Sequence, residues 1–157
     1  MIVIEKPMKT DTTKTREELF QEMAKSYTVC HSQSCPIRQH CLRSILSSYV
    51  PGNYPVVTCI NLLNPRMQSD DCPQYRPADP VRMPLGLKRM YYDMPGHLER
   101  SIKAHLINLL SRKGYYKYHS ARRPVTPDIE QLIRQTLRAF GWTQEPAFDD
   151  YVEEYLW

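Results

Sequence analysis

The chemistry-bearing residues of this chain gather in one short segment. Three of its five cysteines and two of its five histidines lie in "VCHSQSCPIRQHCLR", residues 29–43. Four residues separate Cys30 from Cys35 and five separate Cys35 from Cys41, while Cys72 follows 31 positions later. A short turn between two cysteines lets both thiolates approach one ion at about 2.3 Å. The spacing predicts a metal site formed by Cys30, Cys35, Cys41 and Cys72, with zinc as the expected ion.

Three other interpretations of the same cysteines stay open. An iron–sulfur cluster needs the same four thiolates, and the spacing does not distinguish it from zinc. The thiols could also be inert, because buried cysteines behave as small hydrophobic residues. Pairing of Cys30 with Cys41 would instead indicate redox or disulfide chemistry. Cys59 alternates with Val57 in an apolar stretch and is expected in the core. His31 and His40 each follow or precede a cysteine and could replace one as ligand, but we expect them to lie outside the ligand set.

The elements that must position these cysteines are short. A helix is predicted over residues 14–26 and a second over "RQHCLRSILSS", residues 38–48. The β-branched stretch 54–61 predicts a strand. Residues 64–84 hold five prolines, which exclude a long helix and predict an extended loop around Cys72.

The C-terminal half is expected to be mainly helical. Apolar stripes predict helices over 97–113 and 127–141, the second opened by Thr126 and Pro127. Between them, "YYKY" predicts a strand that turns back to form a tyrosine-rich strand pair. The closing "FDDYVEEYLW" is expected to form a last helical turn.

Together these elements predict an α+β, mainly helical fold in a single small domain, residues 1–157. Residues 1–26 form an N-terminal tail and helix, 27–84 a cysteine-rich metal-site region with a long proline-rich loop, and 85–157 a helical region with a short tyrosine-rich strand pair. No apolar stretch is long enough to span a membrane, and the N-terminus lacks the features of a secretory signal. We therefore expect a cytoplasmic protein with reduced thiols and no membrane partner.

Charge is distributed unevenly along the chain. Residues 82–123 carry ten Lys and Arg against two acids, whereas residues 124–157 carry two Arg against seven acids. A basic segment can bind an anionic partner, either nucleic acid or an acidic protein, or the two segments can neutralise each other. The basic face expected to bind nucleic acid consists of Lys103, Arg112, Lys113, Lys117, Arg122 and Arg123.

Two functional classes compete. No phosphate-binding loop, HExxH or GxSxG motif occurs, and a metal held by four cysteines has no open position for a substrate. This favours a non-enzymatic binding or regulatory module stabilised by a zinc-type site. The alternatives are a winged-helix-like protein that binds nucleic acid, with Lys117, Arg122 and Arg123 on the wing, and an iron–sulfur or thiol redox protein.

Four segments resemble a known family: "CHSQSCPIRQHCLR", "LNPRMQSDDCPQY", "GYYKYHSARRPVTPDIEQLIRQ" and "FDDYVEEYLW". They are similar to a bacterial family of unknown function, numbered 6078 and common in Bacteroidales, over about residues 27–157. The family pattern includes counterparts of Cys30, Cys35, Cys41 and Cys72 but none of Cys59. The resemblance implies the same four-cysteine ligand set, and it implies no activity.

Overall fold

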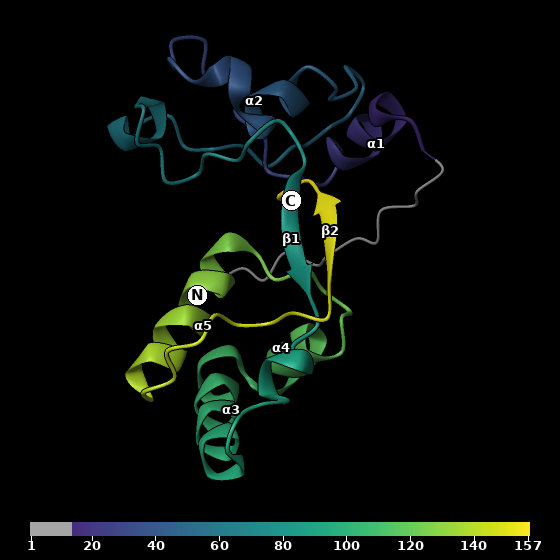
Figure 1. Cartoon of the computed structure of the whole chain (residues 1–157). Helices are drawn as coiled ribbons and strands as arrows, with labels where there is room; N and C mark the ends of the chain where they lie inside the picture. The colour runs from purple at the N-terminus through teal and green to yellow at the C-terminus, as the bar shows by residue number, and fades with distance from the viewer. Residues whose placement is uncertain (1–13) are drawn as a thin grey trace. The chain divides into compact units, whose positions relative to one another are not determined.

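The structure is a computed structural model that describes residues 14–157. Within that range the chain divides into two compact units, residues 14–80 with 155–157 and residues 81–154. The chain contains helices and a small antiparallel sheet (Figure 1), which confirms the α+β class. The expectation of a single domain stays a prediction. No helix within residues 14–157 has the length and apolar character needed to cross a membrane.

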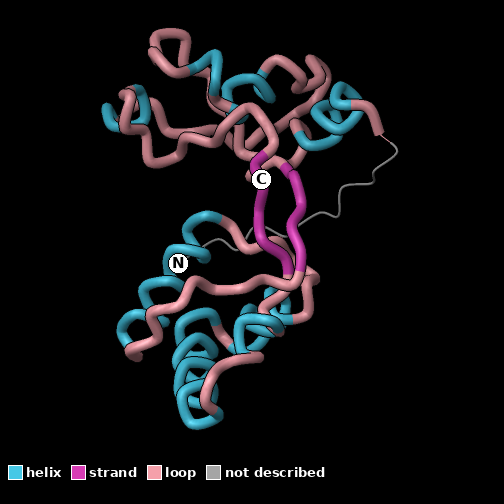
Figure 2. Tube along the Cα trace, in the orientation of Figure 1, coloured by secondary structure: helices cyan, strands magenta, loops and turns pink. Residues whose placement is uncertain are grey.

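The N-terminal unit consists mostly of loops, drawn in pink in Figure 2. Its helices are α1 (Arg16–Met23) and α2 (Leu42–Ser47), with 3-10 turns at Arg38–His40 and Pro65–Gln68. The predicted helix over 14–26 is confirmed as α1. A capping box begins it, because the Thr15 side chain accepts the Glu18 N–H while the Glu18 carboxylate accepts the Thr15 N–H.

A small aromatic core holds the N-terminal unit together. Phe20 of α1 packs with Leu42 and Leu46 of α2, all three at most 1% exposed. The Trp157 ring meets the Phe20 ring edge-on, with centroids 6.3 Å apart. The Tyr27 hydroxyl donates to the Leu156 carbonyl at 3.3 Å. The last three residues thus complete this unit's core.

Two expectations for this unit are wrong. The helix predicted over 38–48 is interrupted at Cys41, whose backbone is extended (φ −100°, ψ 118°) and bridges to Pro77. The strand predicted over 54–61 is absent, and one isolated bridge between Val29 and Cys59 stands in its place. Val56 is 78% exposed, so this stretch has no neighbouring sheet face on which its apolar side chains could pack.

The second unit contains the sheet. Strand β1 (Val81–Leu85) pairs antiparallel with β2 (Asp150–Glu154), in a register that runs from Val81 opposite Glu154 to Leu85 opposite Asp150. The last helical turn predicted for "FDDYVEEYLW" is therefore wrong, and the predicted proline-rich loop ends in a strand. Pro84 is tolerated in β1 because a two-stranded sheet has only edge strands.

Three helices build the rest of the second unit: α3 (Gly96–Leu110), α4 (Arg112–His119) and α5 (Pro127–Ala139), with a 3-10 turn at Arg89–Tyr91. Helix α5 confirms the second predicted helix. The first predicted helix ends at Leu110, because Ser111 has a positive φ of 62° and is the N-cap residue of α4. Their core includes Ile102, Leu106, Tyr115, Ile133 and Leu137.

The tyrosine-rich strand pair is absent, since "YYKY" lies inside α4. The Ser111 side chain accepts the Gly114 N–H at 3.2 Å and so caps the start of this helix. Tyr115 and Tyr118 are buried and three residues apart, which is the spacing of one helix face. The tyrosine pattern of this segment thus has the period of a helix. The winged-helix arrangement, which needs two strands at this point of the chain, is wrong.

Candidate metal centre

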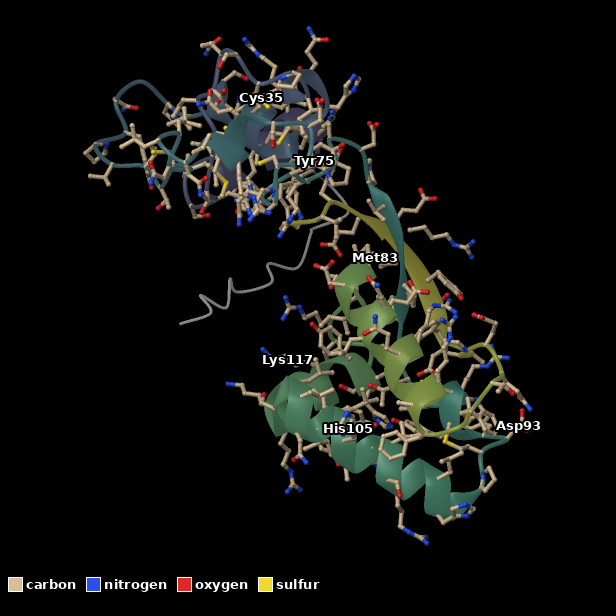
Figure 3. All side chains as sticks on the ribbon, turned by 90° about the vertical axis from the view of Figure 1, so that its left-hand side faces the viewer. Cys35, Tyr75, Met83, Asp93, His105 and Lys117 are labelled. Atoms are coloured by element: carbon tan, nitrogen blue, oxygen red, sulfur yellow. The ribbon has the colours of Figure 1, made fainter. Side chains whose placement is uncertain are left out.

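The four predicted ligands line one cavity in the N-terminal unit. Cys30, Cys35, Cys41 and Cys72 share its wall with three apolar side chains, Ile37, Ile60 and Met67. The volume of this cavity is about 10 Å³. Cys35 is labelled in Figure 3, within this unit. The structure thus brings cysteines from the 29–43 segment and from the distant proline-rich loop to one place.

Local hydrogen bonds fix the first two cysteines. The Cys30 N–H donates to the Arg43 carbonyl at 2.9 Å, so this segment lies beside the start of α2. The Cys35 N–H donates to the buried Ser32 hydroxyl at 3.2 Å, which closes the turn between the two cysteines. Ser32 in turn donates to the Gln68 side chain at 2.9 Å. Cys30 and Cys35 are both buried.

Backbone pairing positions the other two cysteines. On either side of the extended Cys41, Leu42 N–H donates to the Arg76 carbonyl at 2.8 Å and Ala78 N–H donates to the His40 carbonyl at 3.0 Å. Cys72 is half-buried, and its carbonyl accepts the Tyr75 N–H at 3.0 Å. The proline-rich loop is therefore bonded directly to the Cys41 segment.

The surroundings of Cys30 disfavour its thiolate form. Burial raises the pKa of Cys30, the Ser32 backbone N–H opposes this rise, and negative charge on Cys41, Cys35 or Cys72 raises the pKa further. All five cysteines are free thiols. A divalent cation would remove the mutual repulsion by binding the thiolates directly.

The side chains do not yet have ligand geometry. No group of three or more His, Cys, Asp or Glu side chains in residues 14–157 is arranged to hold a metal ion. The backbone brings the four cysteines to one cavity without bringing their sulfur atoms into one coordination sphere. Coordination there requires a spacing of about 4 Å between the sulfur atoms.

The remaining cysteine and the nearby histidines lie elsewhere. Cys59 is exposed, so its predicted core position is wrong. Its backbone bridges to Val29, yet its side chain is absent from the cavity wall. His31 and His40 are exposed and do not line the cavity either.

The sequence did not predict one charged residue of the cavity wall, Arg43. Its side chain is only 4% exposed, and it lines the cavity together with the four cysteines. The available signal was its place in α2 between Leu42 and Leu46, which are both fully buried. An arginine beside such residues can lie on the buried side of a short helix.

The six predicted nucleic-acid residues lie in the second unit on α3, on α4 and in the turn after α4. The Lys103 ammonium lies 5.9 Å from the centre of the Tyr116 ring, and the Arg123 guanidinium 5.5 Å from that of Tyr118. Lys117 is labelled on this helical part in Figure 3. Exposed side chains belong to Arg112, Lys113 and Arg122, and half-buried ones to Lys103, Lys117 and Arg123.

Three acids of the C-terminal segment, Glu130, Glu145 and Asp149, have other partners. Arg134 pairs with both Glu130 and Glu145. Asp149 accepts the backbone N–H groups of Lys88 and Arg89, the second at 2.7 Å. Among residues 14–157, none of the six basic residues forms an ion pair with a carboxylate.

The fold and the cavity define a small α+β protein whose N-terminal unit has a cavity lined by four cysteines. Residues 8–157 match the family described as Family of unknown function (DUF6078), and the chain belongs to that family. This match confirms the family resemblance noted in the sequence, and the link to Bacteroidales stays a prediction. No curated protein and no solved structure matches the chain.

Proposed function

We propose that this protein is a non-enzymatic binding or regulatory module whose N-terminal unit is stabilised by a zinc ion bound to Cys30, Cys35, Cys41 and Cys72. The observation that carries the proposal is the single cavity that all four cysteines line. Four thiolate ligands would leave no coordination position for a substrate, so the metal's role would be structural.

The loop-rich character of the N-terminal unit supports a structural role for the metal. Few regular elements and a small aromatic core hold residues 14–80. In such units, metal binding supplies folding free energy that the core alone cannot provide. A reducing compartment such as the cytoplasm would keep the four thiols available for the metal.

Elemental analysis of the full chain, purified under reducing and anaerobic conditions, tests this proposal. The expected result is about one zinc per chain, as one four-thiolate site requires. Iron with acid-labile sulfide would support the iron–sulfur alternative. Metal-free protein that also fails to take up added Zn²⁺ would favour inert thiols. Metal-free protein that forms a Cys30–Cys41 disulfide on oxidation would favour redox chemistry.

The second candidate function is binding of nucleic acid through Lys103, Arg112, Lys113, Lys117, Arg122 and Arg123. The supporting observation is that, within the described residues, none of these six side chains forms an ion pair with a carboxylate. The exposed Tyr116 beside Lys103 adds a ring on which a base could stack. Titration with duplex DNA at two salt concentrations tests it, and an absence of binding at low salt would exclude it. An acidic protein partner is the alternative anion, and its binding would depend less steeply on salt.

A further inference from the structure

Arg43 is the one buried side chain with a full charge among residues 14–157. Burying an unpaired charge costs several kcal/mol, so buried cations normally have an anionic partner. Arg43 has none in the described residues: its Nε donates to the Gln74 carbonyl at 3.0 Å and its Nη1 to the Thr28 carbonyl at 2.8 Å. Its Cζ lies 4.6 Å from the centre of the Tyr27 ring. All of these partners are neutral.

The contacts of Arg43 join the segments that carry three of the four cysteines. Thr28 lies two residues before Cys30, and Gln74 lies two residues after Cys72. Arg43 itself lies two residues after Cys41. Its own carbonyl also accepts the Cys30 N–H at 2.9 Å. One side chain therefore ties together the backbone around the cavity that it helps to line.

The charge of Arg43 fits a cavity that becomes anionic when loaded. A divalent ion bound by four thiolates carries a net charge of about −2, whereas four neutral thiols carry none. We propose that Arg43 is the positioning residue and counter-charge of the cysteine site, and that the site takes a divalent metal ion as an anionic four-thiolate complex. This inference rests on the zinc site proposed above and adds the residue that determines its charge.

A matched pair of substitutions separates charge from geometry. Arg43→Gln and Arg43→Lys both lose the guanidinium fork, but only Lys keeps the positive charge. Zinc affinity of the full-length, metal-free protein is measured by competition with a chromophoric chelator. Arg43→Gln should weaken binding by about 10- to 100-fold, as expected for a residue that supports metal ligands. Arg43→Lys should recover at least about threefold of that loss, because it keeps a positive charge beside the cavity.

Arg38→Gln is the control. Arg38 also lines the cavity, but its side chain is exposed and its Nη1 bonds to the Gln33 carbonyl and side chain. Its substitution should leave zinc affinity within about twofold of the wild type, because a solvated charge interacts weakly. Arg43→Gln with affinity as high as that of Arg38→Gln would overturn the inference. Equal losses in Arg43→Gln and Arg43→Lys would overturn the counter-charge role.

The outcome for the wild type separates this inference from the proposed function. If the wild type binds no zinc, the zinc site itself fails and Arg43 loses its role with it. If the wild type binds zinc and the two Arg43 variants match it, only the inference fails. Should Arg43→Gln not fold by circular dichroism, Arg43→Met replaces it as the neutral variant, with the same expected loss and the same comparison with Arg43→Lys.

Discussion

The backbone N–H of Cys30 donates a hydrogen bond of 2.9 Å to the carbonyl of Arg43. This bond holds the first cysteine of the chain's cysteine cluster beside the first turn of α2, which begins directly after Cys41. Cys30 and Cys41 are therefore placed by the same short helix. A change at either cysteine should affect the whole cavity.

We expect Cys41→Ser to release the proposed metal and to loosen the N-terminal unit. Serine is a much weaker zinc ligand than a thiolate, and in a loop-rich unit the metal-binding free energy is folding free energy. The measurement is the zinc content per chain together with limited proteolysis of residues 29–80. Cleavage should increase there, while the second unit, with its own core, stays protected.

Cys59→Ser is the matched control for that experiment. Cys59 is exposed and absent from the cavity wall. Its substitution should leave zinc content unchanged and alter stability by less than about 0.5 kcal/mol, as is usual for surface positions. Equal metal loss in both variants would mean that Cys59, and not one of the four proposed ligands, completes the site.

A second prediction concerns the basic face of the second unit. If all six cations contact phosphates of duplex DNA, the log–log dependence of affinity on salt should have a slope of about −5. Lys113→Ala, in the exposed first turn of α4, should reduce the magnitude of this slope by about one. Lys25→Ala, an exposed lysine outside that face, should leave the slope unchanged. A wild-type slope near zero would exclude phosphate contact by this face.

A third prediction concerns Gly86, which has a φ of 75°. An added Cβ there would lie 2.1 Å from Oδ2 of Asp149, the carboxylate that accepts the Lys88 and Arg89 N–H groups. Gly86→Ala should therefore destabilise the protein by about 2–4 kcal/mol, because it adds backbone strain and displaces this carboxylate. The free energy of unfolding in urea is the measurement.

Gly141→Ala separates the two causes. Gly141 has a similar φ of 82°, but nothing lies within 4 Å of an added Cβ. Only the backbone strain remains in Gly141→Ala, so we expect its free energy of unfolding to fall by about 1 kcal/mol. Equal losses at both positions would show that the Asp149 contact contributes nothing.

The sequence allowed prediction of those elements whose pattern repeats over several turns. The apolar stripe of α5 and its Thr126–Pro127 start identified that helix. The cysteine spacing likewise selected four residues that share a cavity. The helix signal lies within one short stretch of sequence. The cysteine prediction required only that the thiols lie away from solvent.

The remaining elements depend on contacts that a short window does not contain. β2 exists because β1, 69 residues earlier, pairs with it, and the acidic "DYVEE" has no strand signal of its own. The break at Cys41 likewise depends on pairing with Pro77. Arg43 is buried because two distant carbonyls, those of Thr28 and Gln74, accept its donors. Partners so far apart in sequence left no pattern to detect.

The last prediction concerns two buried tyrosines of the second unit. The hydroxyls of Tyr91 and Tyr115 lie 3.0 Å apart and bond to each other. Burial raises the pKa of Tyr115 to about 12 and raises that of Tyr91 as well, so both stay neutral at physiological pH. Tyr115→Phe would leave the buried Tyr91 hydroxyl without this partner, and we expect a loss of about 1–3 kcal/mol in the free energy of unfolding.

The double variant Tyr91→Phe/Tyr115→Phe should cost less than the sum of the two single variants, because it removes both polar groups and leaves neither unsatisfied. Tyr92→Phe is the control. Its side chain is 75% exposed, so its loss should be below about 0.5 kcal/mol. Urea unfolding of the four variants and the wild type gives the coupling energy between Tyr91 and Tyr115 directly. Strictly additive losses would mean that the two hydroxyls do not depend on each other, and that water already satisfies each of them.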